Sequence, residues 1–348
     1  MTAIIDLRTD FVSTPTDAMI EAMVRAARRP PAFGLRDDPA VAELESTAAD
    51  MLGMEDALFC ATCAAANQIA IHLHCRPGDA IVAEAGAHII TSEAGAHAAL
   101  TGAVIRALPP HPAVPDDHTL AAAFAPAAAQ RSRAALLWLE NTHVGSGGTV
   151  LPPAQTRRMV AMARQAGASV HLDGSRLFNA ANHLGVTAAV LTRDVDSVSV
   201  SLNKGLAAPL GAILAGTRSF VDEATRVRQM LGGGWRPAHI PAAAALVGLR
   251  TMVDRLGQDH ANAQALARAL VELPALRIDL AQVQTNIVFV GIDPTVVSAA
   301  ALGQRLAGLG VLAHEIGQDR LRLVTWHAIG PAEVSRVVDA FATALRQL

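Results

Sequence analysis

The sequence has no tyrosine, few other aromatic residues and only three cysteines in 348 residues. Three cysteines in so long a chain do not make a disulfide framework, so we expect a protein of the reducing cytoplasm. The formal net charge is −3, and there is no run of basic residues. Nucleic acids bind proteins mainly through clustered positive charge, so the composition argues against a nucleic-acid partner.

The sequence also lacks a long apolar run. Its longest weakly charged stretch, Ala57–Cys75, contains a threonine, an asparagine, a glutamine and two histidines, and this polarity argues against a membrane span. At the N-terminus Asp6 and Arg8 precede any apolar segment, so no signal peptide is predicted. The length and the apolar content of 51% suffice for a large domain and a smaller one.

Short apolar runs alternate with segments of helical spacing through most of the chain. The predicted strands are Ala57–Cys60, Asp79–Glu84, Arg133–Asn141, Ala168–Asp173, Asp196–Asn203 and Gly211–Gly216. The predicted helices are Thr16–Arg29, Ala40–Leu52, one opening at Ala61–Gln68, one from Thr91, Pro152–Gln165 and Val221–Met230. Such alternation predicts an α/β fold with a mostly parallel sheet covered on both faces. Before it, Ile5–Pro15 is predicted to be an extended arm.

The C-terminal third has a different pattern. One or two long helices are predicted over Ile240–Arg268, alternating strands at Gln284–Val290 and Leu321–Thr325, and a closing amphipathic helix at Pro331–Leu348. We therefore predict a large domain over residues 1–246 and a small α+β domain over residues 247–348.

Lys204 is the most informative single residue. It is the only charged residue in Ser197–Gly216, between two strands that read as buried. Burying a lysine is costly unless it is paired or chemically used, and its amine pKa falls readily there, which favours Schiff-base chemistry. The alternative is an ordinary lysine that extends from a strand end to solvent.

Asp173 ends the preceding strand, and in α/β sheets the carboxyl ends of strands line the binding crevice. Pyridoxal phosphate needs a lysine to hold its aldehyde and a carboxylate to keep its ring nitrogen protonated. Asp173 and Lys204 supply this pair, so we predict pyridoxal phosphate as the cofactor. Asp173-Gly174 also fits a simple turn.

Five segments carry a resemblance: IDLRTDFVSTPT, LENTH, HLDGSRLFNA, VSVSLNKGLAAPLGAILAG and MLGGGWR, in this order from Ile5 onward. Together, and in this order, they resemble the L-threonine aldolase family, within the β-eliminating-lyase group of pyridoxal-phosphate enzymes. The resemblance implies the aspartate-aminotransferase-like fold, with a mostly parallel seven-stranded sheet. It also implies a cytoplasmic homodimer or homotetramer with active sites at the subunit interface.

The start of the helix at ATCAAANQ is the implied phosphate site. Backbone N–H groups and the helix dipole favour an anion there. The family usually has Ser-Gly-Thr where this chain has Thr62-Cys63-Ala64, so one hydroxyl is kept and one is lost. The resemblance gives Thr62 and Cys63 to the cofactor, together with Asn203, which stands where a serine usually precedes the lysine.

The same stretch permits a competing prediction of zinc. Cys60 and Cys63 followed by His72, His74 and Cys75 resemble the spacing of metal ligands. The run of small apolar residues between them favours a packed helix, so no metal is predicted.

The resemblance also implies roles for two histidines. His88 would lie over the cofactor ring and could move protons, and His143 would face the substrate's β-hydroxyl. A solitary histidine is more often hydrogen-bonded in a core, and this reading stays open for both.

Arginines are implied for the anionic groups. Arg176 and Arg322 would bind the substrate carboxylate, which a planar guanidinium grips with two hydrogen bonds, and Thr9 would assist. Arg176 is also assigned to the cofactor. Arg236 would reach a phosphate across a subunit boundary. Two departures lie near these positions: Phe33 replaces a family tyrosine, and Gln229 replaces a usual lysine.

The predicted reaction is the cleavage of L-β-hydroxy-α-amino acids, such as threonine, allo-threonine or a 3-arylserine, to glycine and an aldehyde. Catalysis is assigned to Lys204, Asp173, His88 and His143. Related chemistry on small amino acids, namely transaldolation, β-elimination or racemisation, is the alternative, because fold and cofactor do not fix the reaction. The third hypothesis is a non-catalytic binding protein of the same fold. The presence of both Lys204 and Asp173 argues against it.

Overall fold

The computed structural model describes residues 4–110, 115–125 and 130–346, which form two compact units. The larger unit comprises Thr14–Ser146 and Val150–Val253, and the smaller comprises the described parts of Met1–Ser13, Gly147–Thr149 and Asp254–Leu348. The predicted domain boundary after residue 246 remains a prediction. Among the described helices, none combines the length and the apolar character needed to cross a bilayer.

The larger unit is built on a seven-stranded sheet. Its order is β2 (Asp56–Cys60), β8 (Ala212–Gly216), β7 (Ser197–Ser201), β6 (Ser169–Asp173), β5 (Ala134–Glu140), β3 (Ala80–Glu84) and β4 (Val104–Leu108). Only β8 runs antiparallel to its neighbours. Every residue of β7 and β8 is buried, as expected for strands covered on both faces. The predicted mostly parallel sheet is confirmed.

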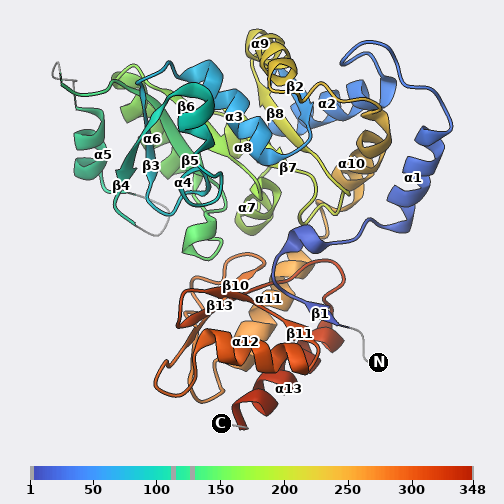
Figure 1. Cartoon of the computed structure of the whole chain (residues 1–348), viewed down its shortest axis with the longest axis vertical. Helices are drawn as coiled ribbons and strands as arrows, with labels where there is room; N and C mark the ends of the chain where they lie inside the picture. Colours follow the sequence, from blue (N-terminus) through green and yellow to red (C-terminus); the bar gives the residue numbers. More distant parts are fainter. Residues whose placement is uncertain (1–3, 111–114, 126–129, 347–348) are drawn as a thin grey trace. The chain divides into compact units, whose positions relative to one another are not determined.

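Helices surround this sheet (Figure 1). They are α1 (Asp17–Ala27), α2 (Pro39–Leu52), α3 (Cys63–His74), α4 (His88–Thr91), α5 (Asp117–Phe124), α6 (Pro153–Gln165), α7 (Leu177–Leu184), α8 (Ala188–Thr192), α9 (Arg218–Met230) and α10 (His239–Thr251). Hydroxyl or carboxylate side chains at the N-caps of several of them, including Thr16, Asp38 and Thr62, accept backbone N–H groups that would otherwise lack partners. Two apolar clusters, around Ile81 and around Leu214, fix α3 and α9 to the sheet.

Two local predictions were wrong. No long helix starts at Thr91: α4 ends there, Ala94 (φ 53°) and Gly95 (φ 72°) adopt left-handed conformations that break it, and a short π-helix follows at His97–Thr101. The arm is not extended throughout, because Asp10–Val12 forms a 3₁₀ turn that Thr9 caps by accepting from Phe11 N.

The smaller unit contains a four-stranded antiparallel sheet in the order β12 (His314–Ile316), β13 (Arg320–Val324), β10 (Ile287–Ile292) and β9 (Leu276–Arg277). A parallel pair, β1 (Ile5–Asp6) with β11 (Val311–Leu312), completes its strands. Alternate residues of β10 and β13, such as Val290 and Leu323, are buried in a core with α11 (Leu256–Leu270), α12 (Ala299–Gly308) and α13 (Pro331–Arg346). The opposite, more polar face carries Arg320 and Arg322 beside Phe289.

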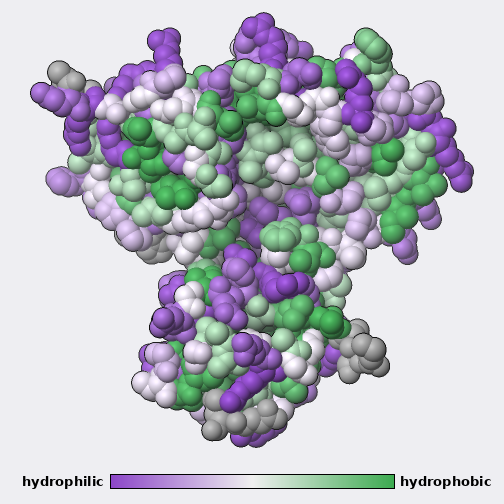
Figure 2. Space-filling model, in the orientation of Figure 1, coloured by the Kyte–Doolittle hydropathy of each residue, from purple (hydrophilic) through white to green (hydrophobic). Residues whose placement is uncertain are grey.

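On the face that Figure 2 shows, hydrophilic and hydrophobic residues are mixed, and one of several apolar areas lies over α1 of the larger unit. Ile20 and Val24, four residues apart on this helix, keep 46% and 48% of their surface exposed. Apolar side chains that share one exposed helix face are typical of contacts with another protein surface.

Candidate active site

Three neighbouring parallel strands bring polar groups to one edge of the large sheet. Glu140 at the end of β5 is in register with Asp173 at the end of β6, and Asp173 is in register with Ser199 of β7. Lys204 follows β7 by three residues. The carboxyl ends of parallel strands therefore gather these groups, as the sequence predicted.

Asp173 is buried, and each of its two oxygens accepts a hydrogen bond. Its Oδ2 accepts from Asn67 Nδ2 at 2.9 Å, and its Oδ1 accepts from Ser175 N at 3.0 Å. Burial alone raises the pKa of this carboxyl, but the positive charge of Lys204, the neighbouring His88 and these hydrogen bonds outweigh it and hold the pKa below its ordinary value. The site therefore holds a carboxylate that stays ionised at neutral pH.

Lys204 lies in a turn whose backbone is held by hydrogen bonds on both sides of the residue. Ala207 N donates to Lys204 O at 2.9 Å, and Leu202 N donates to Gly211 O at 2.9 Å. The residue is half-buried, and its charge helps to lower the pKa of Asp173 and opposes the burial that raises the pKa of Cys63. The predicted pair is thus brought together. Lys204 is also the only lysine in the chain, so no other side-chain amine competes for its chemistry.

Cys63, at the first position of α3, faces the same carboxylate. Its Sγ receives the Ser175 hydroxyl at 3.3 Å and lies 3.5 Å from Ser199 Oγ and 4.0 Å from Asp173 Oδ1. Beside it the hydroxyl oxygen of Thr62 accepts from Ala65 N at 3.0 Å, so Thr62 is the helix N-cap. The proposed phosphate contacts of both residues remain predictions.

All three cysteines should resist alkylation in the folded protein. Burial raises the pKa of Cys60 to about 12, of Cys63 to about 11 and of Cys75 to about 12, and only a thiolate reacts. Iodoacetamide at pH 8 is expected to add no mass to the native chain and three groups after unfolding. Cys63 is the most exposed of the three, so a native chain that gains one group on Cys63 would contradict the raised pKa of that thiol.

A metal centre has little support in the described part of the chain. There, the cysteines and histidines of the zinc alternative do not gather into a ligand group. His88, Glu93 and Asp173 do have ligand atoms within 4.8 Å of one another. The amide of Asn67 already donates to both carboxylates, and the charge of Lys204 opposes a cation beside Asp173. We interpret this group as a hydrogen-bond network.

His88 begins α4 and is held at two points. Its backbone N donates to Glu140, and its ring Nδ1 lies 2.9 Å from Oε1 of Glu93. Glu93 was missed by the sequence analysis, which assigned the segment after His88 to the start of a helix. An acid five residues after the histidine, in a segment of small and apolar residues, was the available signal.

His143 is buried among acids. Its Nε2 lies 2.9 Å from Glu84 Oε2 and 3.8 Å from Glu140 Oε2, and its Nδ1 lies 2.7 Å from Ser146 Oγ. Burial lowers the pKa of His143, although Glu84 acts in the opposite direction. Burial and the charge of Asp173 raise the pKa of Glu140 well above its ordinary value. His143 is therefore a neutral imidazole able to accept a proton.

The alternating serines of β7 have a structural explanation. Ser199 Oγ donates to Asn67 Oδ1 at 2.6 Å, and Ser197 Oγ lies 2.8 Å from ring nitrogens of both His171 and His74. Burial lowers the pKa of His171 to about 3 and of His74 to about 4. This neutral network joins β7 to α3. Through Ser199 it also holds Asn67, the residue that donates to Asp173.

The remaining predicted residues of the larger unit surround this centre less directly. Arg176 is buried at the start of α7, just after β6, and Asn203 is half-buried beside Lys204. Arg236 is exposed, with its guanidinium carbon 5.9 Å from the centroid of the Phe33 ring. Their roles remain predictions.

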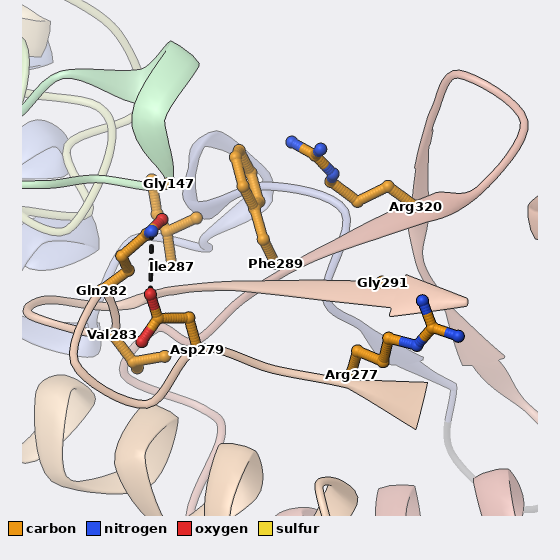
Figure 3. Close-up of a pocket in the computed structure, with 9 residues that line it drawn as sticks. All are labelled: Gly147, Arg277, Asp279, Gln282, Val283, Ile287, Phe289, Gly291 and Arg320. Atoms are coloured by element: carbon orange, nitrogen blue, oxygen red, sulfur yellow. Dashed lines mark hydrogen bonds between the residues drawn. The ribbon is translucent and has the colours of Figure 1, made fainter. Parts of the chain in front are cut away.

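Thr9 and Arg322 belong to the smaller unit. Thr9 is buried as the cap of the 3₁₀ turn, and Arg322 lies on the polar face of β13, where its guanidinium donates to Arg8 O at 3.2 Å. The same face holds a hollow of about 220 Å³ (Figure 3). Two further arginines, Arg277 and Arg320, flank Gly291 in register there.

Figure 3 shows Arg320 directed over Phe289, and the guanidinium carbon is 5.3 Å from the ring centroid. The dashed bond in the figure joins Gln282 to Asp279 at 2.9 Å. The hollow contains none of the predicted site residues. Arg320 therefore provides a comparison for Arg322 on the same strand and the same face.

Comparisons with known proteins show the family of the chain. The sequence model of the family described as Beta-eliminating lyase matches residues 6–293. Low-specificity L-threonine aldolase 1 of Arabidopsis thaliana is 35% identical over 98% of this chain and 96% of its own length. Low specificity L-threonine aldolase of Escherichia coli K12 is 35% identical over 96% of this chain and 97% of its own length.

Among solved structures, the threonine aldolase of Leishmania major superimposes with a TM-score of 0.84, covering 98% of this chain and 99% of its own, at 20% identity. That likeness supports the fold, and the sequence identity to the curated relatives supports the membership. The chain belongs to the β-eliminating-lyase family and, within it, to the L-threonine aldolases.

Proposed function

We propose that this protein cleaves L-β-hydroxy-α-amino acids, including threonine, allo-threonine and 3-arylserines, to glycine and an aldehyde, with pyridoxal phosphate as its cofactor. The observation that carries the proposal is the ionised, buried Asp173 beside the only lysine of the chain. The curated relatives, which bear the name threonine aldolase, support the reaction.

The donor set at the sheet edge fits the cofactor. An ionised carboxylate is the group that keeps a pyridine nitrogen protonated, and Lys204 offers the amine that holds the aldehyde. The start of α3 at Thr62 and Cys63 offers backbone N–H groups to the phosphate, and His88 would lie over the ring. When bound, pyridoxal phosphate supplies the electron sink for bond cleavage at the substrate α-carbon.

The protein's own residues bind and orient the substrate. Arg176 and Arg322, with Thr9, would hold the carboxylate, which decides whether the Cα–Cβ bond is aligned for cleavage. Neutral His143 would accept the β-hydroxyl proton while the Cα–Cβ bond breaks, and the adjacent Glu84 stabilises the imidazolium that results. The α-carbon then takes up a proton, which gives glycine.

We also propose a cytoplasmic homodimer or homotetramer in which Arg236 serves a neighbouring active site. Arg236 is exposed beside Phe33, which keeps 96% of its surface exposed, and Met230 nearby in sequence keeps 61%. Exposed aromatic and apolar side chains around an arginine are typical of interface anchors. Light scattering of the purified protein tests this assembly.

The function is tested by supplying threonine, phenylserine and serine separately to the purified protein. Aldehyde release from the first two supports the aldolase, whereas pyruvate release from serine indicates an eliminating lyase. If neither threonine nor phenylserine yields an aldehyde, the proposed reaction is wrong. Racemisation is followed in parallel by chiral chromatography of alanine.

Arg322→Gln is expected to raise KM for threonine by about 10-fold or more, because a bidentate contact to the carboxylate is lost. Arg320→Gln, on the same strand and face, should change KM by less than about twofold, since exposed surface charges contribute little. Steady-state kinetics of the two variants measure this difference. Equal effects of both would remove Arg322 from the carboxylate site.

A further inference from the structure

Glu93 is a buried carboxylate with three hydrogen-bond donors around it. It lies in the bend after α4, and its side chain keeps only 1% of its surface exposed. Oε1 receives Asn67 Nδ2 at 2.7 Å and lies 2.9 Å from His88 Nδ1, and Oε2 receives Gln68 Nε2 at 2.6 Å. No step assigned above uses this residue.

The chemistry of a carboxylate fixes the proton on His88. Both oxygens of Glu93 already accept amide N–H groups, from Asn67 and Gln68, and a carboxylate that acts as an acceptor on both oxygens favours the hydrogen on Nδ1 of His88, 2.9 Å away. Nε2 is then the ring nitrogen that takes up or releases a proton. A histidine with one nitrogen held by a buried acid is oriented as well as fixed in its tautomer.

The same carboxylate also orients the amide of Asn67. Asn67 Nδ2 donates to Glu93 Oε1 and to Asp173 Oδ2, while its Oδ1 accepts from Ser199. Two acids on the nitrogen side and a hydroxyl on the oxygen side leave one orientation of the amide. One NH₂ group therefore links the two carboxylates.

We propose that Glu93 is a positioning residue that fixes the Nδ1–H tautomer of His88 and holds Asn67 against Asp173. Glu93 would thereby link His88, which is assigned to the face of the cofactor ring, to Asp173, which is assigned to the ring nitrogen. The catalytic consequence rests on the proposed function. The hydrogen-bond arrangement does not, and it is measured separately.

The test compares Glu93→Gln with Glu45→Gln. Glu45 is a matched control because it is equally buried in the same unit, where it accepts from Phe59 N at 2.7 Å and pairs with Arg36. Both proteins are labelled with ¹⁵N-histidine, and long-range ¹H–¹⁵N spectra report which ring nitrogen is protonated. The His88 signals are assigned by their loss in His88→Asn, and spectra are recorded with and without bound pyridoxal phosphate.

In the wild-type protein we expect Nδ1 of His88 to be protonated, and in Glu93→Gln we expect the two tautomers to mix. Glu93→Gln should lower kcat for threonine by about 100-fold with KM changed less than about threefold, because general acid–base catalysis depends on the correct proton position. Glu45→Gln should leave the His88 signals and kcat unchanged and lower only the melting temperature.

Two results would overturn the proposal: a wild-type His88 that is unprotonated at Nδ1, or a Glu93→Gln protein with unaltered His88 signals. The first is measured without Glu93→Gln, since its assignment needs only His88→Asn, so it decides the matter even where Glu93→Gln does not fold. A wild-type protein that releases no aldehyde would refute the proposed function instead, and the spectra would still decide whether Glu93 positions His88.

Discussion

Lys204→Ala is expected to lower the rate of aldehyde release from threonine by about 10³-fold or more, because the amine that forms the covalent link is removed. Because the chain has no other lysine, a covalent link to a lysine side chain can form only at Lys204. A lysine-specific protease cuts the unmodified chain once, after residue 204. Borohydride reduction of the protein with its cofactor should block this cut and add the mass of the cofactor.

Lys204→Arg is the companion variant. It keeps the positive charge beside Asp173 but has no amine able to form an imine, so it should be as inactive as Lys204→Ala. A protein with arginine at this position that keeps a tenth of the wild-type rate would show that the charge, and not the amine, carries the chemistry. Reduced wild-type protein that is still cut after residue 204 would contradict the covalent role directly.

Asp173→Asn is expected to lower kcat by about 10³-fold, with a smaller loss of cofactor affinity, because a neutral amide cannot keep the ring nitrogen protonated. The substitution also places an amide group opposite Asn67 Nδ2, where the wild-type protein has a charged acceptor. The measurements are kcat for threonine and the absorbance spectrum of the bound cofactor.

Asp196→Asn is the control for Asp173→Asn. Asp196 lies just before β7, at the opposite edge of the sheet, where its Oδ2 accepts from Val170 N at 2.7 Å. Its loss should affect stability and leave kcat within about twofold, since it is far along the strand from the reacting groups. If Asp173→Asn lowered kcat no more than Asp196→Asn does, the assigned role of Asp173 would be wrong.

Much of the architecture followed from local patterns. The apolar runs that became β5, β6 and β8 are short and continuous, as expected for strands buried on both faces, and helical segments separate most of them. Asp173 and Lys204 were recognisable because each interrupts or ends such a run, where a charge is costly without a use. Their positions at the ends of apolar runs therefore identified Asp173 and Lys204, on which the proposed chemistry depends.

The partners of these groups were not predictable in the same way. Asn67 and Gln68 read as ordinary polar residues of a helix, and Glu93 lies in a segment where the expected helix does not form. Glu84 ends a strand that carried no special signal, yet its carboxylate lies 2.9 Å from His143. Each of these contacts joins residues from different elements, and helical or strand periodicity reports only on neighbours within one element.

The sequence by itself determined the α/β class, the mostly parallel sheet, the family, and the placing of a lysine and an aspartate at neighbouring strand ends. Tertiary structure decided which charges and donors meet: Asn67 between Glu93 and Asp173, Cys63 against the same aspartate, and Glu84 against His143. The physical reason is that the cost of burying a charge and the periodicity of apolar residues can both be judged from neighbouring positions in the sequence. Protonation and orientation depend instead on atoms a few ångströms apart in space, and those atoms come from distant positions in the sequence.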